Sequence, residues 1–319
     1  MSIIVGYKRS LHGVLSFRPV TAVFRPYGVF ELHHLLASCS QEQRHLIKSA
    51  ALSVHKLVFQ RGVLTHVDRQ AEDDICGPTI DTVLLGEELA VWLENQPADS
   101  RLIALEVGPG SGFLSSLLAG AECVERLYAV DLNPSAVKCT LKNLYINGAS
   151  LKALTPKISV RAESFDAAEF PGRFDLIVSN PPYLPLSPDR DNQTDSEGYG
   201  LAVGGLRLCQ DIINALEEKL SPRGRLLLMT SSASITEIRR LLPADFRIIP
   251  VMDGAGIRVP LDVDSMWEDS EWRKHLLLEK RIEVDENGDL WHYIQPMWID
   301  RKPEIANCGS AGDGNSPAI

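Results

Sequence analysis

Residues 102–112 read LIALEVGPGSG, an apolar run that ends at an acidic residue and is followed by three closely spaced glycines. Such a run is typical of a strand buried on both faces of a sheet. Apolar side chains at helical spacing follow over residues 113–120, so the stretch predicts a strand, a tight turn and a helix. Gly108, Gly110 and Gly112 can take positive φ beside the free N–H groups at the start of that helix. This geometry indicates a binding site for a nucleotide-like molecule.

The glycine spacing distinguishes two kinds of nucleotide site. The dinucleotide fingerprint is G-x-G-x-x-G, whereas this stretch reads G-x-G-x-G, with Glu106 two residues before Gly108. The pattern resembles the first motif of class I S-adenosylmethionine-dependent methyltransferases, whose acidic residue and glycine backbone hold the methionine part of the cofactor. The resemblance therefore implies S-adenosyl-L-methionine as the cofactor and disfavours NAD. A glycine turn that binds no ligand is the structural alternative.

Length and composition set the class of protein expected. The 319 residues suffice for one catalytic domain with an appendage. The 42 acidic and 32 basic residues give a net charge of −10, which argues against a broad phosphate-binding surface. Six scattered cysteines without a C-x-x-C pair, and histidines without a Cys/His cluster, favour reduced thiols and no metal site. The sequence shows no long apolar span and no signal-peptide core, so we expect a cytoplasmic protein without a membrane partner.

The residues before the glycine motif predict three elements. A capping-box pattern at Ser40 precedes apolar residues at helical spacing, so we expect a helix over about residues 41–56. Alternation around Arg61-Gly62 predicts a short hairpin. A further helix is expected after Pro78, with apolar residues Val83, Leu84, Leu89, Trp92 and Leu93.

A second strand is expected to end at Asp131, about twenty residues after the glycines. A carboxylate there can accept hydrogen bonds from both ribose hydroxyls of the cofactor. Asn133 and Pro134 are typical of the start of a helix and Gly148 of its end. This helix is expected to face the sheet with its apolar residues, Val137, Leu141, Leu144 and Tyr145. Strands that alternate with helices predict a parallel, doubly wound sheet.

A third strand is predicted in KISVRAESFD, residues 157–166, and a fourth over Phe174–Ser179. Asn180-Pro181-Pro182-Tyr183 follows the fourth strand, at the edge where ligands bind in open parallel sheets. A proline-rich strand exit is the structural alternative, although a chance NPPY is uncommon. The order of glycine motif, Asp131 and NPPY resembles amino-methyltransferases. These enzymes methylate nitrogen conjugated to a planar system: adenine N6, cytosine N4, guanine N2 or the side-chain amide of glutamine.

The residue types of the NPPY motif fit the chemistry of a weakly nucleophilic nitrogen. The lone pair of an amide or exocyclic amino group is delocalised, so the nitrogen needs orientation more than deprotonation. The side-chain oxygen of Asn180 and the carbonyl of Pro181 can each accept one N–H and direct the lone pair toward the methyl group. The prolines fix the turn, and Tyr183 can stack on a planar target. Aspartate at position 180 would still accept the hydrogen bond, so we expect Asn180→Asp to be milder than alanine.

HemK-type methyltransferases share more of this chain than the two motifs. They carry a hairpin before the glycine motif, a P-x-x-(D/E)-T-x-x-L-L element over the cofactor pocket, and NPPYLP. This sequence has the hairpin around Arg61, residues 180–185 as NPPYLP, and the element's residues Pro78, Asp81, Thr82 and Leu85. The alternative for the element at Pro78 to Leu85 is an ordinary packing helix with no role at the cofactor pocket.

The resemblance also implies the site residues. In the HemK pattern an acidic residue followed by an aromatic one binds the adenine, and Glu163, Ser164 and Phe165 compete for these roles, with Phe165 favoured as the aromatic. The implied catalytic residues are those of the motif: Asn180, Pro181, Pro182 and Tyr183. The implied cofactor-binding residues follow the strand ends: Glu106, Gly108, Gly110, Gly112, Asp131, Leu132, Ser164, Phe165 and Asn180.

The chain after the motif completes the expected sheet. One helix with Leu208, Ile212 and Leu216 on one face precedes a Pro222-Arg223-Gly224 turn and a fifth strand. Ser234 and Glu237 are expected to cap the next helix, and FRIIPV, residues 246–251, reads as a sixth strand.

The segment beyond Val251 departs from the compact pattern. A helix is expected over about residues 265–279, where Trp267 and Trp272 favour packing over a role in substrate access. Asn287-Gly288 predicts a hairpin whose second arm, LWHYIQPMWI, is the seventh strand.

These features predict a Rossmann-like, doubly wound and mostly parallel α/β sheet of seven strands. The expected organisation is an N-terminal accessory region over residues 1–68, a methyltransferase domain over 69–301 with an insertion at about 253–289, and a disordered tail over 302–319.

The function expected is transfer of a methyl group from S-adenosyl-L-methionine to a planar amide or amino nitrogen. The resemblance favours a protein glutamine side chain, and the acidic balance agrees with a protein substrate. Methylation of RNA or DNA at adenine N6 or guanine N2 is the alternative, after extrusion of the base. A non-catalytic cofactor-binding protein would be expected to lose Asn180 or the glycines, and both are present. An NAD oxidoreductase is disfavoured by the glycine spacing.

Overall fold

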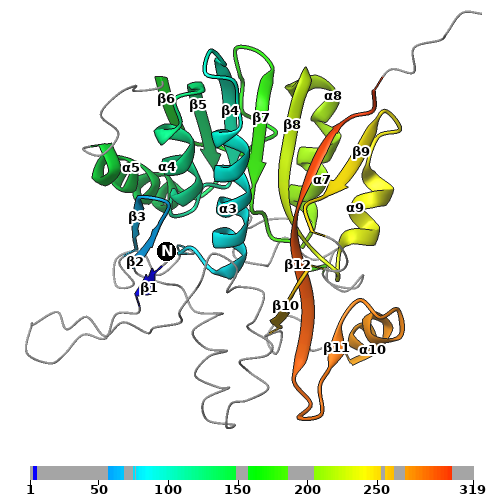
Figure 1. Ribbon diagram of the computed structural model, residues 1–319. Coiled ribbons are helices and arrows are strands. Elements are labelled where there is room, and N and C mark those ends of the chain that lie inside the picture. The colour runs from blue at the N-terminus through cyan, green and yellow to red at the C-terminus, as the bar shows by residue number, and fades with distance from the viewer. Residues whose placement is uncertain are drawn as a thin grey trace, which may run out of the picture.

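The computed structural model describes residues 3–5, 57–67, 75, 77–148, 157–185, 205–252, 256–261 and 270–303. Within them the chain forms a small antiparallel sheet and a nine-stranded sheet flanked by helices (Figure 1). The small sheet consists of β1 Ile3–Val5, β2 Leu57–Gln60 and β3 Val63–His66. Strands β2 and β3 confirm the hairpin predicted around Arg61-Gly62. The helix expected over about residues 41–56 lies outside the described residues, as do Trp267 and the expected tail from residue 304 on.

The large sheet has the order β10-β12-β8-β7-β4-β5-β6, and β9 and β11 also pair with β12. Its strands are β4 Leu102–Val107, β5 Val124–Asp131, β6 Lys157–Ala162, β7 Phe174–Ser179, β8 Leu220–Ser231, β9 Phe246–Pro250, β10 Ile257–Pro260, β11 Glu283–Val284 and β12 Leu290–Arg301. The neighbours from β8 to β6 are parallel, whereas β12 runs antiparallel to β8 and β9. The mostly parallel, doubly wound fold is therefore confirmed, β11 and β12 form the hairpin predicted at Asn287-Gly288, and β10 adds a strand that was not expected.

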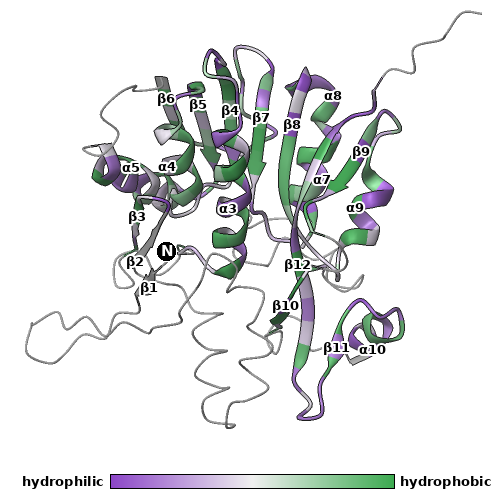
Figure 2. Ribbon diagram, in the orientation of Figure 1, coloured by the Kyte–Doolittle hydropathy of each residue, from purple (hydrophilic) through white to green (hydrophobic). Residues whose placement is uncertain are grey.

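Successive side chains of the central strands point to opposite sides of the sheet, and both sides are buried because helices cover each of them. Ala104 of β4 and Leu176 of β7 pack on one side, against α3 Ile80–Glu94 and α4 Phe113–Gly120. Their neighbours Leu105 and Ile177 pack on the other side, against α7 Arg207–Asn214, α8 Leu216–Lys219 and α9 Ile235–Leu241. Figure 2 shows the resulting hydrophobic colouring along β7 and β8. The helices cover the two faces of the sheet, and the motifs lie at the carboxyl ends of its parallel strands.

Helix α5, Pro134–Gly148, starts and ends as predicted, and Val137 and Leu144 are buried as expected, but the other two predicted residues are not. The Asn133 side-chain oxygen accepts the Ser135 N–H at 2.8 Å and caps the helix. Leu141 and Tyr145, expected to be inward, are 48 % and 86 % exposed. The buried stripe instead contains Ala136, Val137, Cys139, Thr140, Asn143, Leu144 and Asn147. Apolar spacing alone misplaced the stripe because two of its members are asparagines whose amides bond to β3.

Three further predictions needed correction. The helix expected to run through Leu216 is interrupted at Ala215, between α7 and α8. The Pro222-Arg223-Gly224 segment lies within β8, beside a register shift against β7, and not before the strand. The Ser234 and Glu237 side chains do not cap α9: the Ser234 hydroxyl donates to the Ser231 carbonyl at 3.2 Å, and Glu237 pairs with Arg281.

Candidate functional site

The turn after β4 needs glycine at each of its three predicted positions. Gly108, Gly110 and Gly112 have φ of 72°, 52° and 77°, the left-handed region that strains other residues. A Cβ added to Gly112 would lie 2.7 Å from the Cα of Thr140 on α5, so a side chain has no room there. The Gly108 N–H donates to the Val130 carbonyl at 2.9 Å, which ties the turn to β5. The predicted strand, turn and helix are confirmed.

Two carboxyl groups, the buried Glu106 and the half-buried Asp131, border this turn. Glu106 is 1 % exposed and accepts a hydrogen bond from the Ser115 hydroxyl on α4. Burial raises the pKa of Glu106 to about 8, with a smaller contribution from the charge of Asp131. Burial also raises the pKa of Asp131, whose carboxylate accepts the N–H groups of Gly110 at 3.1 Å and Asn133 at 2.9 Å. The glycine turn, Glu106 and Asp131 thus form one cluster that could hold a cofactor.

Asn180 follows β7 directly and is fixed by its amide nitrogen. The Ser179 hydroxyl donates to the Val107 carbonyl at 2.7 Å, which joins the ends of β7 and β4. The Asn180 amide nitrogen then donates to Asp81 Oδ2 at 3.1 Å and to Thr82 Oγ1 at 2.8 Å. Its side-chain oxygen Oδ1 is buried and has no hydrogen-bond partner among the described residues. A buried acceptor without a donor costs free energy, so this oxygen points to a donor on a ligand.

Asp81, at the start of α3, anchors the NPPY motif. Its Oδ2 accepts both the Asn180 amide and the Tyr183 hydroxyl, the latter at 2.9 Å. Its Oδ1 accepts the Thr79 hydroxyl and the Thr82 N–H. The sequence singled out Asp81 and Thr82 by their place in a family element, but it gave no sign that they bond to Asn180.

His292 is a residue at this site that the sequence did not indicate. Its ring on β12 stacks on Tyr183, with the centroids 6.3 Å apart and an interplanar angle of 29°. Burial lowers the pKa of His292 to about 3, so the ring is neutral near pH 7. Its Nδ1 lies 2.7 Å from the Ser231 hydroxyl oxygen, which accepts the Ala233 N–H and so has its own proton free to donate to Nδ1. A lone histidine within a strand carries no motif, which explains why it was missed.

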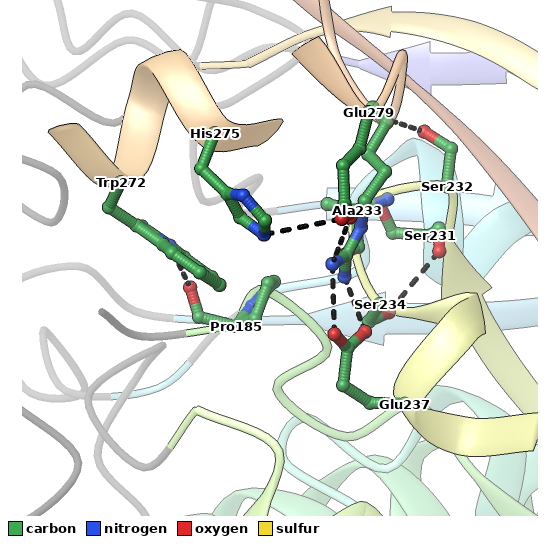
Figure 3. A network of polar contacts seen from close by, with 10 residues as sticks. Pro185, Ser231, Ser232, Ala233, Ser234, Glu237, Trp272, His275 and Glu279 are labelled. Atoms are coloured by element: carbon green, nitrogen blue, oxygen red, sulfur yellow. Dashed lines mark hydrogen bonds and ion pairs between the residues drawn. The ribbon is translucent and has the colours of Figure 1, made fainter. Parts of the chain in front are cut away.

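Helix α10, Ser270–Leu278, reaches the residues that follow the motif. The Trp272 indole N–H donates to the Pro185 carbonyl at 3.3 Å, and the Trp272 and His275 rings stack 5.2 Å apart (Figure 3). Arg281, just beyond the helix, donates to Glu237 Oε1 at 2.8 Å and to the Ala233 carbonyl. Helix α10 and Arg281 are therefore attached to the motif exit and to the turn between β8 and α9, respectively.

The other predicted site residues differ in their surroundings. Leu132 is 40 % exposed, and Ser164 is partly exposed beside Asp166, whose pKa its hydroxyl lowers. Phe165 is 3 % exposed in the core with Leu105 and Val130, so its ring is enclosed by apolar side chains. Pro181 is buried, and the Pro182 carbonyl accepts the Cys209 thiol at 3.5 Å. Their roles stay predictions.

The described part of the chain holds no group of three or more His, Cys, Asp and Glu side chains placed to bind a metal ion. It also has no helix of the length and apolarity needed to cross a membrane.

Comparison with known proteins assigns the family. The chain is 33 % identical over 174 residues to Methyltransferase HEMK2 of Mus musculus, covering 52 % of this chain and 75 % of that protein. The chain belongs to the HemK-like methyltransferase family. A family model described as Methyltransferase small domain also matches residues 87–196 of this HemK-like protein. This makes the protein an S-adenosylmethionine-dependent methyltransferase and confirms the methyl donor expected from the glycine motif.

Two further relatives carry different acceptors in their names. Release factor glutamine methyltransferase of Koribacter versatilis is 31 % identical over 172 residues, covering 51 % of this chain and 59 % of the relative. tRNA1(Val) (adenine(37)-N6)-methyltransferase of Porphyromonas gingivalis is 30 % identical over 173 residues, covering 53 % of this chain and 64 % of the relative. Both acceptors are planar groups with an amino or amide nitrogen.

Proposed function

We propose that this HemK-like protein methylates the side-chain amide nitrogen of a protein glutamine. The observation that carries the proposal is the state of Asn180: both donors of its amide nitrogen are used by Asp81 and Thr82, while its buried Oδ1 has no hydrogen-bond partner among the described residues. An N–H of a planar primary amide is a donor that fits this acceptor. The similarity to HEMK2 and to a release factor glutamine methyltransferase supports glutamine as the amide.

In this reaction the NPPY motif orients the target nitrogen. Asn180 Oδ1 and the Pro181 carbonyl each accept one N–H of the target, which turns the face of its nitrogen toward the methyl donor. As the new C–N bond forms, the nitrogen becomes positive and its N–H groups become stronger donors, so both acceptors stabilise the transition state more than the ground state. Transfer would break the methyl–sulfur bond of the donor and leave neutral S-adenosylhomocysteine, and loss of one N–H proton to water would restore the neutral amide.

The cluster around the glycine turn would hold the cofactor. Glu106 and the turn backbone would bind the methionine part, and Asp131 would accept the ribose hydroxyls. S-adenosylmethionine, when bound, supplies a methyl group on a positively charged sulfur. Two observations support this fit. The three glycines have the conformations that the turn needs, and burial raises the pKa of both carboxyl groups. A cationic ligand would favour the ionised form of each carboxyl group.

Cofactor affinity should therefore depend on pH through Glu106. Its pKa is about 8 in the free protein, so the carboxyl is mostly neutral at pH 6 to 7 and must lose its proton to pair with the cofactor's amino group. We expect the affinity for S-adenosylhomocysteine to fall by up to about tenfold per pH unit below pH 8. Calorimetry at pH 7 in two buffers of different ionisation enthalpy should show proton release on binding.

Glu106→Gln is the control for this titration. The amide keeps an acceptor for Ser115 but cannot ionise, so the dependence below pH 8 should disappear, apart from any part due to Asp131. Proton release of the same size in Glu106→Gln would show that another group titrates.

Methylation of adenine N6 in RNA is the second candidate, favoured by the relative from Porphyromonas gingivalis. An adenine amino group can donate to the same acceptor, since it too is planar and conjugated. The net charge of −10 weighs against it, because nucleic-acid binding draws on Lys and Arg contacts to phosphates.

Labelled S-adenosylmethionine and a cell extract distinguish the two acceptors. Protein glutamine predicts label that protease releases and nuclease does not, and acid hydrolysis of the labelled protein should yield methylamine from the amide. Asn180→Ala, incubated with the same extract, corrects for labelling by other enzymes. Label released by nuclease and recovered as methylated adenine would overturn the glutamine proposal.

A further inference from the structure

The N-terminal hairpin is docked on helix α5 by two asparagine side chains. Asn143 and Asn147 are 0 % and 3 % exposed. The oxygen of Asn143 accepts the His66 N–H at 2.8 Å, and its nitrogen donates to the His66 carbonyl at 2.9 Å. Asn147 makes the same pair of bonds with Leu64, at 2.9 Å and 2.8 Å. Because each amide both donates and accepts, its orientation is fixed.

The match between helix and strand has a simple geometric basis. Residues four apart on a helix are separated by about 6.0 Å along its axis, and residues two apart on a strand by about 6.6 Å. Leu64 and His66 point their backbone groups to the same edge of β3, so the two amides take the place of a neighbouring strand. The hairpin is thereby tied rigidly to α5.

Asn143 differs from Asn147 in what it does with its second amide hydrogen. Asn143 donates it to the Ser111 carbonyl in the glycine turn, at 2.8 Å. Asn147 donates to the Asn143 carbonyl within its own helix at 2.7 Å, with a longer contact of 3.4 Å to the Ser116 hydroxyl. Among the hydrogen bonds of the described residues, Asn143 bonds directly to the 108–112 turn and Asn147 does not. Asn143 bridges hairpin and turn with one side chain.

We propose that Asn143 is a positioning residue of the cofactor site, which couples the N-terminal hairpin to the glycine turn. A turn with three glycines can adopt many backbone conformations, so several hydrogen bonds are needed to hold it in one of them. From α5, Asn143 holds the Ser111 carbonyl and Thr140 holds the Gly110 carbonyl at 3.1 Å. Through Asn143, the hairpin over residues 57–66 is thus linked to the turn of the cofactor site. This inference concerns the cofactor and does not depend on which acceptor is methylated.

Asn143→Ala and Asn147→Ala form a matched pair of variants. Each removes one buried amide and two hairpin bonds, so both should lower the thermal midpoint by similar amounts. Only Asn143→Ala also frees the Ser111 carbonyl, and we expect its Kd for S-adenosylhomocysteine to rise about tenfold, against less than about twofold for Asn147→Ala. Equal losses of affinity in the two variants, or no loss in Asn143→Ala, would overturn the proposal.

Hydrogen exchange provides a second test, whose decisive part uses the parental protein. If the turn and the hairpin are coupled, a ligand that orders the turn must also order the hairpin, because coupling between two sites is reciprocal. S-adenosylhomocysteine should slow exchange of the His66 amide, and Asn147→Ala should keep this protection while Asn143→Ala loses it. Exchange at His66 that is unchanged by saturating S-adenosylhomocysteine would refute the coupling even if Asn143→Ala does not fold.

Discussion

Replacing Asn180 by alanine should lower the turnover number by about 100-fold or more, the loss typical of one preorganised polar group at a reacting centre. The affinity for S-adenosylhomocysteine should change little, because the Asn180 oxygen has no partner in the described chain and is reserved for the acceptor. Single-turnover rates, cofactor affinity and thermal midpoint should be measured on the same preparation.

Ser179→Ala is the matched control for Asn180→Ala. It lies one residue earlier at the same strand end and loses the bond from its hydroxyl to the Val107 carbonyl, without touching the proposed acceptor contact. We expect it to lower stability by about 1 kcal/mol and to leave turnover within a few-fold of the parental rate. An Asn180→Ala variant that is stable, binds cofactor and turns over at the parental rate would remove the catalytic assignment.

The structure reverses the expectation for Asn180→Asp. The sequence suggested a mild effect, because a carboxylate still accepts a hydrogen bond. However, the Asn180 amide nitrogen lies 3.1 Å from Asp81 Oδ2, so aspartate would place two carboxylates in contact. Repulsion between the two carboxylates raises the pKa of the pair, and the hydrogen bond between them returns only when a falling pH supplies a shared proton. We therefore expect Asn180→Asp to be as impaired as alanine at neutral pH and to recover partly as the pH falls.

The parts of the site that the sequence predicted are local. Strand β7 ends at Ser179 as expected, and Gly108, Gly110 and Gly112 all have positive φ, because buried strand runs and tight glycine turns are decided by residues close together in the chain. The place of the NPPY motif followed from the rule that ligands bind at the carboxyl ends of parallel strands.

The parts that it did not predict are pairings between distant polar side chains. Asp81 and Asn180 are 99 residues apart, and which carboxylate meets which amide depends on how α3 packs against β8 and β12 beside the end of β7. The inward turn of Asn143 on α5 was missed for a similar reason: apolar spacing assigns polar residues to the solvent face, and their buried hydrogen bonds become visible once the hairpin is in place. Inference from one sequence therefore finds the motif residues more readily than the residues that hold them.

Asp81→Ala should be nearly as damaging as Asn180→Ala although Asp81 is expected to touch neither cofactor nor acceptor. Without Asp81 Oδ2, the Asn180 amide nitrogen loses one acceptor and the Tyr183 hydroxyl loses its bond at 2.9 Å. The Asn180 amide can then turn over and let its oxygen accept the Thr82 hydroxyl, which takes that oxygen away from the target N–H. We expect turnover to fall by about 30-fold to 100-fold with cofactor affinity nearly unchanged.

A double-mutant cycle separates this positioning role from a general loss of packing. If Asp81 acts through Asn180, the double alanine variant should be no slower than Asn180→Ala alone, because the second substitution has nothing left to disturb. Tyr183→Phe serves as the control, since it removes the other bond to Asp81 Oδ2 and leaves the Asn180 amide held; it should lose far less turnover than Asp81→Ala. Losses that multiply in the double variant would mean that Asp81 and Asn180 contribute independently, and Asp81 would then be a fold residue that happens to lie beside the motif.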